Sequence, residues 1–298
     1  MTHGFDFGSG DLVVMNIAIA AMMFGASLQL TGADFRRLLT QPKAPLAGMV
    51  AQFLLLPLAT FLLTLVLPID AEYKLGMMLV AACPGGAFSN ILTWIARGSL
   101  PVSITMTAAS STLATVLTPL NFALYSSLNP ATRELMTRIS LDPLSLLALI
   151  ALVLALPLAL GMLAGKRFPR FAQRSEPWFR NGSLLAFLMF ISVALSRNLS
   201  LFLEVAPAVL SLVVLHNGVA LLTGYSLARM LRLDGAETRA VTLEIGIQNS
   251  GLALLILFTF YPQAGGMVLV AAMWGLWHLV SGLSLAQFWG WRHRHDLQ

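Results

Sequence analysis

Apolar stretches long enough to cross a membrane follow one another along almost the whole chain. A transmembrane helix needs about 20 predominantly apolar residues, and nine stretches approach or exceed this length. Their ranges are 11–32, 45–68, 74–96, 100–125, 143–165, 182–202, 206–230, 239–261 and 265–291. We therefore predict an all-α polytopic membrane protein with nine transmembrane helices.

Composition indicates a single membrane domain over residues 1–298. Apolar residues make up 57% of the chain and charged residues only 10%, whereas soluble domains carry about 25% charged residues. The single cysteine, Cys83, excludes an internal disulfide framework and a cysteine-based metal cluster. Residues 1–10 contain no Lys or Arg, so we do not expect the first apolar stretch to be a removed signal peptide.

The basic residues predict the orientation, because Lys and Arg concentrate in cytoplasmic loops. With the N-terminus outside, only four of the 18 basic residues lie in outer segments, namely Lys74, Arg133, Arg138 and Arg197. The C-terminus is then cytoplasmic. This bias also explains the basic segment 166–180, which we expect to be a loop without a recognition role, and nucleic acid is not an expected partner.

Two of the predicted helices are interrupted near their middle. The third contains Cys83-Pro84-Gly85-Gly86 followed by Ser89-Asn90, and the eighth contains Glu244 followed by Gln248-Asn249-Ser250-Gly251. Such a break is tolerated inside a membrane only where it is buried in protein or lines a cavity. Paired broken helices indicate the binding site of a secondary transporter.

The two interruptions occupy corresponding places, each in the third helix of a four-helix unit. The expected division is a first repeat at 1–127, a linker helix and basic loop at 128–180, and a second repeat at 181–298. Since the paired members are five places apart in the order of helices, the second repeat is inverted relative to the first. This arrangement is typical of transporters that work by alternating access.

Glu244 is the acidic residue that the apolar pattern places well inside a predicted span. Holding it charged at the bilayer centre would cost at least about 2.5 kcal/mol unless it is paired, and no Lys or Arg lies at the same depth. The carboxyl group must therefore be protonated or bind a cation. Nearby hydroxyl and amide oxygens favour an alkali ion over a transition metal.

Other polar residues in the spans permit a functional or a purely structural role. Ser103 and Thr107 share one helix face, yet such hydroxyls often bond to their own helix carbonyls. Gln52, a lone amide, is commonly a contact between helices. His278 by itself is more simply a neutral histidine that bonds to a neighbouring helix, and the same holds for His216.

At these residues the chain resembles the bile acid:sodium symporter family. The resemblance covers nearly the whole chain and rests on four segments: Val50-Ala51-Gln52-Phe53 through Pro57-Leu58, Cys83 through Asn90, Ser103 through Pro119, and Glu244 through Asn249. It implies an inverted-repeat fold with two crossing broken helices, in the plasma membrane of a bacterium. Bacterial members of known architecture have ten helices, and this chain would lack the first.

The resemblance also implies where two sodium ions and a substrate bind. The first sodium site would use Ser89, Asn90, Ser103, Thr107 and Glu244. The second would use Gln52, Glu244 and Gln248 with the backbone carbonyls of Ile245 and Ile247. Substrate would bind near Ala87, Phe88, Asn249 and His278. Ala87-Phe88 and Leu279 stand where bacterial relatives often have polar residues.

The leading hypothesis is sodium-coupled symport of an organic anion, such as a bile acid-like, pantoate-like or keto acid, with no cofactor beyond the coupling ions. Proton coupling through Glu244 is the nearest alternative. An intramembrane enzyme would need Ser89 or Ser250 as nucleophile, but no Ser/His or Ser/Lys pair supports it. A passive channel would require rings of charge that the sequence lacks.

Overall fold

The described part of the chain is helical throughout. A computed structural model describes residues 30–138, 155–197, 199–261 and 263–295, together with single positions between 17 and 28 and at 148 and 152. Its elements are α2 (Gly32–Thr40), α3 (Lys43–Val50), the π-helix η1 (Ala51–Leu55), α4 (Leu56–Val66), α5 (Ala71–Ala82), α6 (Phe88–Ile95), α7 (Leu100–Leu128), α8 (Pro130–Arg138), α10 (Leu156–Arg167), α11 (Pro169–Arg197), α12 (Leu199–Met230), α13 (Gly235–Gly246), α14 (Ser250–Phe260) and α15 (Gly265–His295). The all-α prediction is confirmed for these residues.

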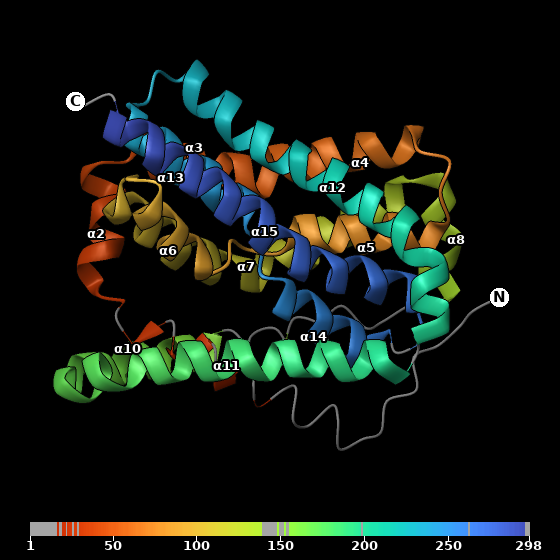
Figure 1. The fold of residues 1–298 in the computed structure, drawn as a ribbon, viewed down its shortest axis with the longest axis horizontal. Coiled ribbons are helices and arrows are strands. Elements are labelled where there is room, and N and C mark those ends of the chain that lie inside the picture. Colours follow the sequence, from red (N-terminus) through yellow and green to blue (C-terminus); the bar gives the residue numbers. More distant parts are fainter. Residues whose placement is uncertain are drawn as a thin grey trace.

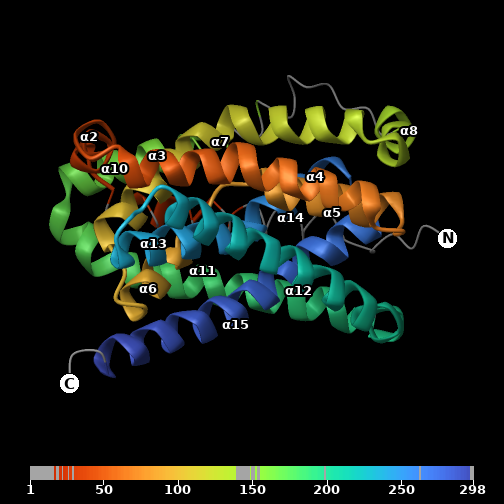
Figure 2. The same ribbon diagram turned by 90° about the horizontal axis from the view of Figure 1, so that it is seen from above.

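The long helices run roughly along the longest axis of the molecule (Figures 1 and 2). At one end lie α2, α6, α13 and the C-terminal end of α15, and α8 lies at the opposite end in both views. Within the described residues, four helices are long and apolar enough to cross a membrane: Lys43–Val66, Leu100–Leu128, Pro207–Met230 and Gly265–His293. Half of the first predicted span, 11–32, and much of the first part of the fifth, 143–165, fall outside the described residues, while α10 covers the end of the fifth.

Several predicted boundaries were wrong. Residues 169–180, expected in a loop, form the first part of α11, and Arg170 and Arg174 have the spacing of one helix face. The predicted break between 202 and 206 does not exist, because α12 continues from Leu199 through it to Met230. Segments expected to be connections also hold the short helices α2 and α8.

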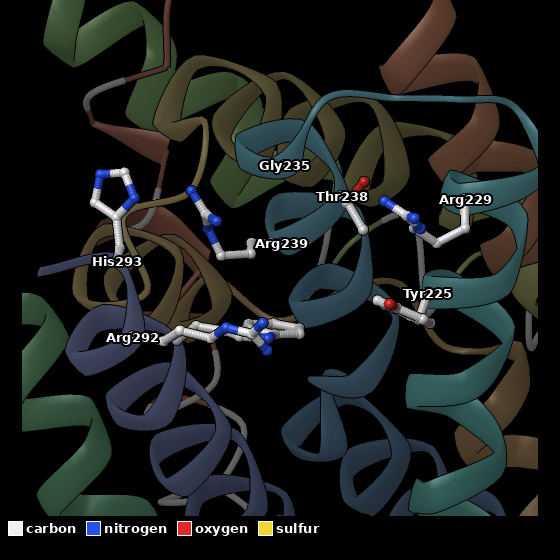
Figure 3. A pocket seen from close by; sticks show the side chains of 8 residues that line it. Tyr225, Arg229, Gly235, Thr238, Arg239, Arg292 and His293 are labelled. Carbon is white, nitrogen blue, oxygen red and sulfur yellow. The ribbon is translucent and has the colours of Figure 1, made fainter. Parts of the chain in front are cut away.

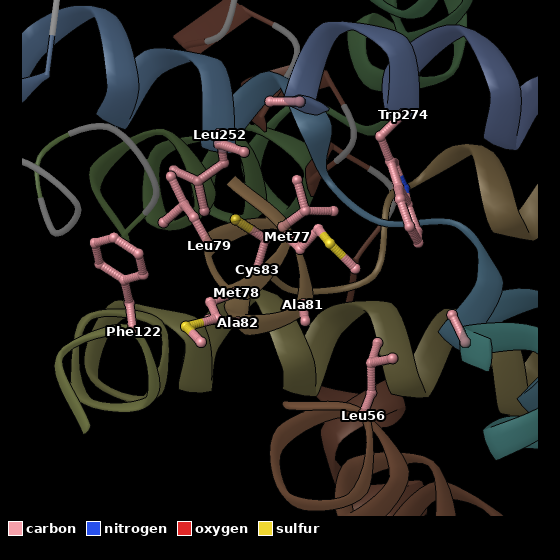
Figure 4. Close-up of a cluster of buried hydrophobic side chains, with 14 of the residues drawn as sticks. Leu56, Met77, Met78, Leu79, Ala81, Ala82, Cys83, Phe122, Leu252 and Trp274 are labelled. Carbon is pink, nitrogen blue, oxygen red and sulfur yellow. The ribbon is translucent and has the colours of Figure 1, made fainter. Parts of the chain in front are cut away.

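A large apolar cluster packs around the end of α5 (Figure 4). Met77, Leu79 and Cys83 are buried there against Leu252 of α14 and Trp274 of α15. Gly76 allows α5 and α15 to approach closely, since a Cβ atom at this position would lie 3.0 Å from Met267 Cα. This packing fixes the position along the long axis of the molecule at which both interrupted helices end.

Candidate ion and substrate site

The two interruptions lie against each other. α5 ends at Ala82 and α6 begins at Phe88, while α13 ends at Gly246 and α14 begins at Ser250, so the predicted breaks are confirmed. The connecting segments pair in antiparallel fashion through Gly85 and Gln248. The Gly86 amide donates to the Ile247 carbonyl at 2.6 Å, and the Asn249 amide donates to the Pro84 carbonyl at 2.9 Å. Each break therefore satisfies backbone groups of the other, as a membrane interior requires.

Glu244 lies at this crossing with its side chain fully buried. Ser89 Oγ of α6 donates to its Oε2 at 2.5 Å, and Thr107 Oγ1 of α7 lies 2.9 Å from its Oε1. Ser103 Oγ is 3.4 Å from the same Oε2 atom. Two helices, α6 and α7, thus bring oxygen atoms to the carboxylate of a third, α13.

Asn90 extends this group of oxygens. Its Oδ1 accepts from Ser103 Oγ at 2.7 Å and lies 3.4 Å from Thr107 Oγ1. Thr107 Oγ1 also lies 3.0 Å from the Ser103 carbonyl, which is the bond within its own helix that the structural alternative predicted. The hydroxyl group takes part in both arrangements. All five residues predicted for the first sodium site are therefore adjacent.

Within the described residues, no basic side chain pairs with Glu244. Its interactions are those with the hydroxyls of Ser89, Ser103 and Thr107. Gly85 lies against the carboxyl group, because a Cβ atom added there would be 2.9 Å from Glu244 Cδ. The glycine lets the backbone of the first break approach the acid of the second.

Gln52 and Gln248 form a second buried group. Gln52 Nε2 donates to Gln248 Oε1 at 2.9 Å and to the Cys83 carbonyl at 2.7 Å, and Gln248 Nε2 donates to the Ile245 carbonyl at 2.7 Å. The Ile247 carbonyl accepts from the Gly86 amide. The described hydrogen bonds do not connect either glutamine side chain to Glu244.

The backbone that carries Gln52 is a π-helix. Pro57 lacks an N–H group and cannot donate to the Phe53 carbonyl in the usual helical pattern, and the amide of Asn121 on α7 donates to this carbonyl instead, at 2.9 Å. π-Helical turns inside α-helices occur frequently at functional sites. Here the turn lies where Gln52 reaches the crossing.

Two residues that our sequence analysis missed complete the ends of the interrupted helices. Thr118 Oγ1 of α7 donates to the Ala82 carbonyl at 2.8 Å, and Asn217 Nδ2 of α12 donates to the Gly246 carbonyl at 2.8 Å. Asn217 is also bound by Ser281 of α15. A single polar residue in an apolar run gives no spacing signal, so only the three-dimensional arrangement reveals these roles.

The residues predicted to bind substrate have different surroundings. Asn249 is buried and caps α14, since its Oδ1 accepts from the Leu252 amide at 3.0 Å. Ala87 and Phe88 are partly exposed at the start of α6, which has no side-chain cap. His278 is 5% exposed and lies one turn before Ser281, and its Nδ1 has no partner in the described structure. The Nδ1 of His216 likewise has no partner in the described structure, but its Nε2 contacts Thr60 Oγ1 at 2.8 Å and its ring packs against Trp274.

Sequence comparison agrees with the resemblance noted from the motifs. Residues 16–205 match the Sodium Bile acid symporter family, which is more than half of the chain. The chain belongs to this family. Members of the bile acid symporter family are transporters, so the alternative of an intramembrane enzyme with Ser89 or Ser250 as nucleophile is excluded, and the protein is a multi-pass membrane transporter.

Curated relatives in the family come from bacteria, plants and animals. The "Uncharacterized sodium-dependent transporter YocS" of Bacillus subtilis is 31% identical over 92% of the chain and 82% of its own length. The "Probable sodium/metabolite cotransporter BASS1, chloroplastic" of Arabidopsis thaliana is 30% identical, and the match spans 66% of its length. The human "Sodium/bile acid cotransporter 4" is 29% identical over 93% of the chain and 62% of its own length.

Proposed function

We propose that this transporter is a symporter that couples the entry of an organic anion to sodium. The observation that carries the proposal is the buried Glu244 carboxylate, which has oxygen neighbours from α6 and α7 and no basic partner in the described residues. An ionised acid in this setting needs a cation. The names of the relatives, which include sodium-dependent transporters and sodium/metabolite cotransporters, support sodium as that cation.

The first sodium site consists of Ser89, Asn90, Ser103, Thr107 and Glu244. Each hydroxyl carries one hydrogen and two lone pairs, and in this structure Ser89 and Thr107 direct their hydrogens at the carboxylate. Rotation of these hydroxyl groups would direct their lone pairs, instead of their hydrogens, towards a cation beside the Glu244 carboxylate. The residues can then bind a cation without a change in the backbone.

The second sodium site consists of Gln52, Gln248, Glu244 and the carbonyls of Ile245 and Ile247. In the structure the two glutamine amides bond to each other, and the Ile247 carbonyl accepts from the Gly86 amide. Binding a cation here requires the glutamines to exchange these bonds for contacts with the ion. Because of this exchange, occupation of the second site changes the hydrogen bonds at the crossing of the two interrupted helices.

The organic anion binds beside the crossing, at the start of α6. The first backbone hydrogen bonds of this helix run from the Ser89 amide to the Gly86 carbonyl and from the Asn90 amide to the Ala87 carbonyl. The backbone amides of Ala87 and Phe88 precede these bonds in the chain. A helix N-terminus favours negative charge. His278 and Asn249 complete the substrate site, and the anion class includes bile acid-like, pantoate-like and keto acids.

The proposed architecture has nine transmembrane helices in two inverted repeats, 1–127 and 181–298, joined by residues 128–180. The N-terminus faces outward and the C-terminus faces the cytoplasm of a bacterial cell. Transport proceeds by alternating access at the crossing. Two sodium ions with one monovalent anion carry one net positive charge inward, which is worth about 2.3 kcal/mol per 100 mV.

Uptake into proteoliposomes tests the coupling directly. Vesicles with equal pH on both sides receive a labelled anion with sodium or potassium outside, and an inside-negative potential is then imposed. We expect uptake only with sodium, and an accumulation that rises by a factor of about 50 per 100 mV. Equal uptake in sodium and potassium refutes sodium coupling, and uptake that follows an imposed proton gradient instead identifies proton coupling.

Thermal unfolding with a panel of anions identifies the substrate, because a bound ligand raises stability by mass action. Each anion is tested with sodium and with potassium. The substrate is expected to raise the unfolding temperature only in sodium.

A further inference from the structure

A second polar cavity lies at the end of the molecule that holds the C-terminus. It has a volume of about 180 Å³ and lies between the end of α12, the start of α13 and the end of α15 (Figure 3). Four basic side chains line it: Arg229, Arg239, Arg292 and His293. The cavity shares no residue with the site around Glu244.

Among the acids nearest in sequence, Asp234 acts electrostatically on Arg239 from outside the cavity. Asp234 and Glu237 do not line it, and they form the capping box of α13, in which each side chain accepts from the backbone amide of the other residue. Arg239 donates through Nη2 to the Arg97 carbonyl, while its Nε is buried without a partner in the described structure. Among the described residues, no acidic side chain lines the cavity, so its lining has donors for a bound anion.

Two hydroxyl-bearing residues, Tyr225 and Thr238, also line the cavity. Pockets for drug-sized ligands usually have volumes of about 300 to 1,000 Å³, so this cavity is too small for a whole bulky organic substrate. It fits a compact oxyanion such as a phosphate group. Guanidinium groups bind phosphate through paired hydrogen bonds.

Exposed apolar side chains lie on two of the helices that line the cavity. Leu222 and Met230 of α12 are 64% and 77% exposed, and Phe288 and Trp291 of α15 are 50% and 53% exposed. In a membrane protein such residues face lipid, and a tryptophan is typical of the interface between hydrocarbon and water. A ligand with a phosphate group and attached acyl chains would satisfy both the basic cavity and its apolar border.

We propose that this cavity binds the phosphate group of an anionic glycerophospholipid. The basic ends of α12 and α15 place the cavity at the cytoplasmic leaflet, and this placement rests on the proposed orientation. Basic pockets between helices on that side are suited to anionic headgroups. Arg239 lies on the same helix as Glu244 and holds the turn after α6 through Arg97. A lipid bound there stabilises the contact between α6 and α13, the two helices that carry Ser89 and Glu244.

Lipid titration of the purified, delipidated transporter tests this site without using sodium or substrate. Native mass spectrometry counts bound phosphatidylglycerol, and thermal unfolding measures its effect; phosphatidylcholine and inorganic phosphate form the comparison arms. The test variant is Arg229→Gln with Arg292→Gln. The matched control is Arg36→Gln with Arg37→Gln, which removes two arginines of α2 at the same end of the molecule but outside the cavity.

We expect one tightly bound phosphatidylglycerol, whose affinity falls about 30-fold in the test variant and stays within about threefold in the control, on the basis of the attraction per basic residue near a charged membrane. Arg229→Lys with Arg292→Lys should retain most of the binding, which separates loss of charge from misfolding. Stabilisation by inorganic phosphate alone that depends on the same arginines would make the ligand a free oxyanion and overturn the lipid assignment. Equal affinity in the test variant and the control overturns the site itself.

Discussion

The two interrupted helices differ in the charged and polar groups that they bring to the crossing. The second, α13 and α14, has a capping box before α13, the buried Glu244 within it and Asn249 as the cap of α14. The first, α5 and α6, contributes the hydroxyl of Ser89 and a break of Pro84, Gly85 and Gly86, and α6 begins without a side-chain cap. One break thus supplies the negative charge, and the other supplies neutral oxygens and open helix amides.

This asymmetry matches the two ligands of the proposed symport. A cation needs the acid of α13 together with oxygens from α6 and α7, whereas an anion needs uncapped amides. Since Asn249 already occupies the α14 amides, the start of α6 is the better place for the anion. The comparison therefore yields separate predictions for the two breaks.

The largest effect is expected from Glu244→Gln. The side chain keeps its shape, its one oxygen can still accept from Ser89 and its NH2 group can donate to Thr107 Oγ1, but it loses the charge that attracts a cation. Sodium-dependent uptake should fall to background, and sodium should no longer raise the unfolding temperature. Glu237→Gln, in the exposed capping box of the same helix, is the control and should retain both responses to sodium.

If Glu244→Gln still shows a sodium-dependent rise in unfolding temperature equal to that of the unaltered protein, the carboxylate is not the ion ligand. The breaks would then differ in sequence only and not in function. Thermal unfolding in sodium and in potassium measures this before any substrate is known.

A smaller effect is expected from Ala87→Asp, which places a negative charge at the open start of α6. The new carboxylate competes for the same amides and repels an anionic substrate, so the KM for substrate should rise about tenfold or more. Ala87→Asn is the matched neutral control. Sodium-induced stabilisation should be unchanged in both variants, and an equal KM in both would place the anion away from α6.

Gly85→Ala tests the close approach between the breaks. Its Cβ would lie 2.9 Å from Glu244 Cδ, so the carboxyl group must move, and we expect the free energy of unfolding to fall by about 1–3 kcal/mol. Gly218→Ala is the control within α12, because a Cβ there meets no atom within 4 Å. Equal unfolding temperatures of the two variants in detergent would mean that the acid and the first break are not in contact.

Much of this comparison was predictable from sequence because both breaks have local signals. Pro84-Gly85-Gly86 cannot continue a helix, and Glu244 is conspicuous in an apolar stretch. The ends of α7 at Asn129 and α14 at Tyr261 likewise have a local signal, because a proline follows each in the sequence. These features depend on residues next to one another in the chain.

The contacts between the breaks were not predictable in the same way. The pairing of Gly85 with Gln248 joins residues far apart in the chain, and the π-helix at Gln52 results from Pro57 together with Asn121 on another helix. The false break between 202 and 206 has a different cause: Glu204 interrupts the apolar run and Pro207 follows it, yet α12 continues through both. A lone polar residue or proline in the sequence does not by itself end a helix.

The smallest effect concerns the carbonyls that end the first halves of the two broken helices. Thr118→Val removes the hydroxyl that binds the Ala82 carbonyl but keeps the side-chain shape, so the free energy of unfolding should fall by about 1 kcal/mol. Asn217→Leu should have a larger effect, because it frees the Gly246 carbonyl and also removes the acceptor of Ser281. Thr112→Val, whose hydroxyl binds only within α7, is the control for losing a hydroxyl. Denaturant unfolding in detergent ranks the three variants, and an Asn217→Leu effect no larger than that of Thr112→Val would show that the end of α13 does not depend on α12.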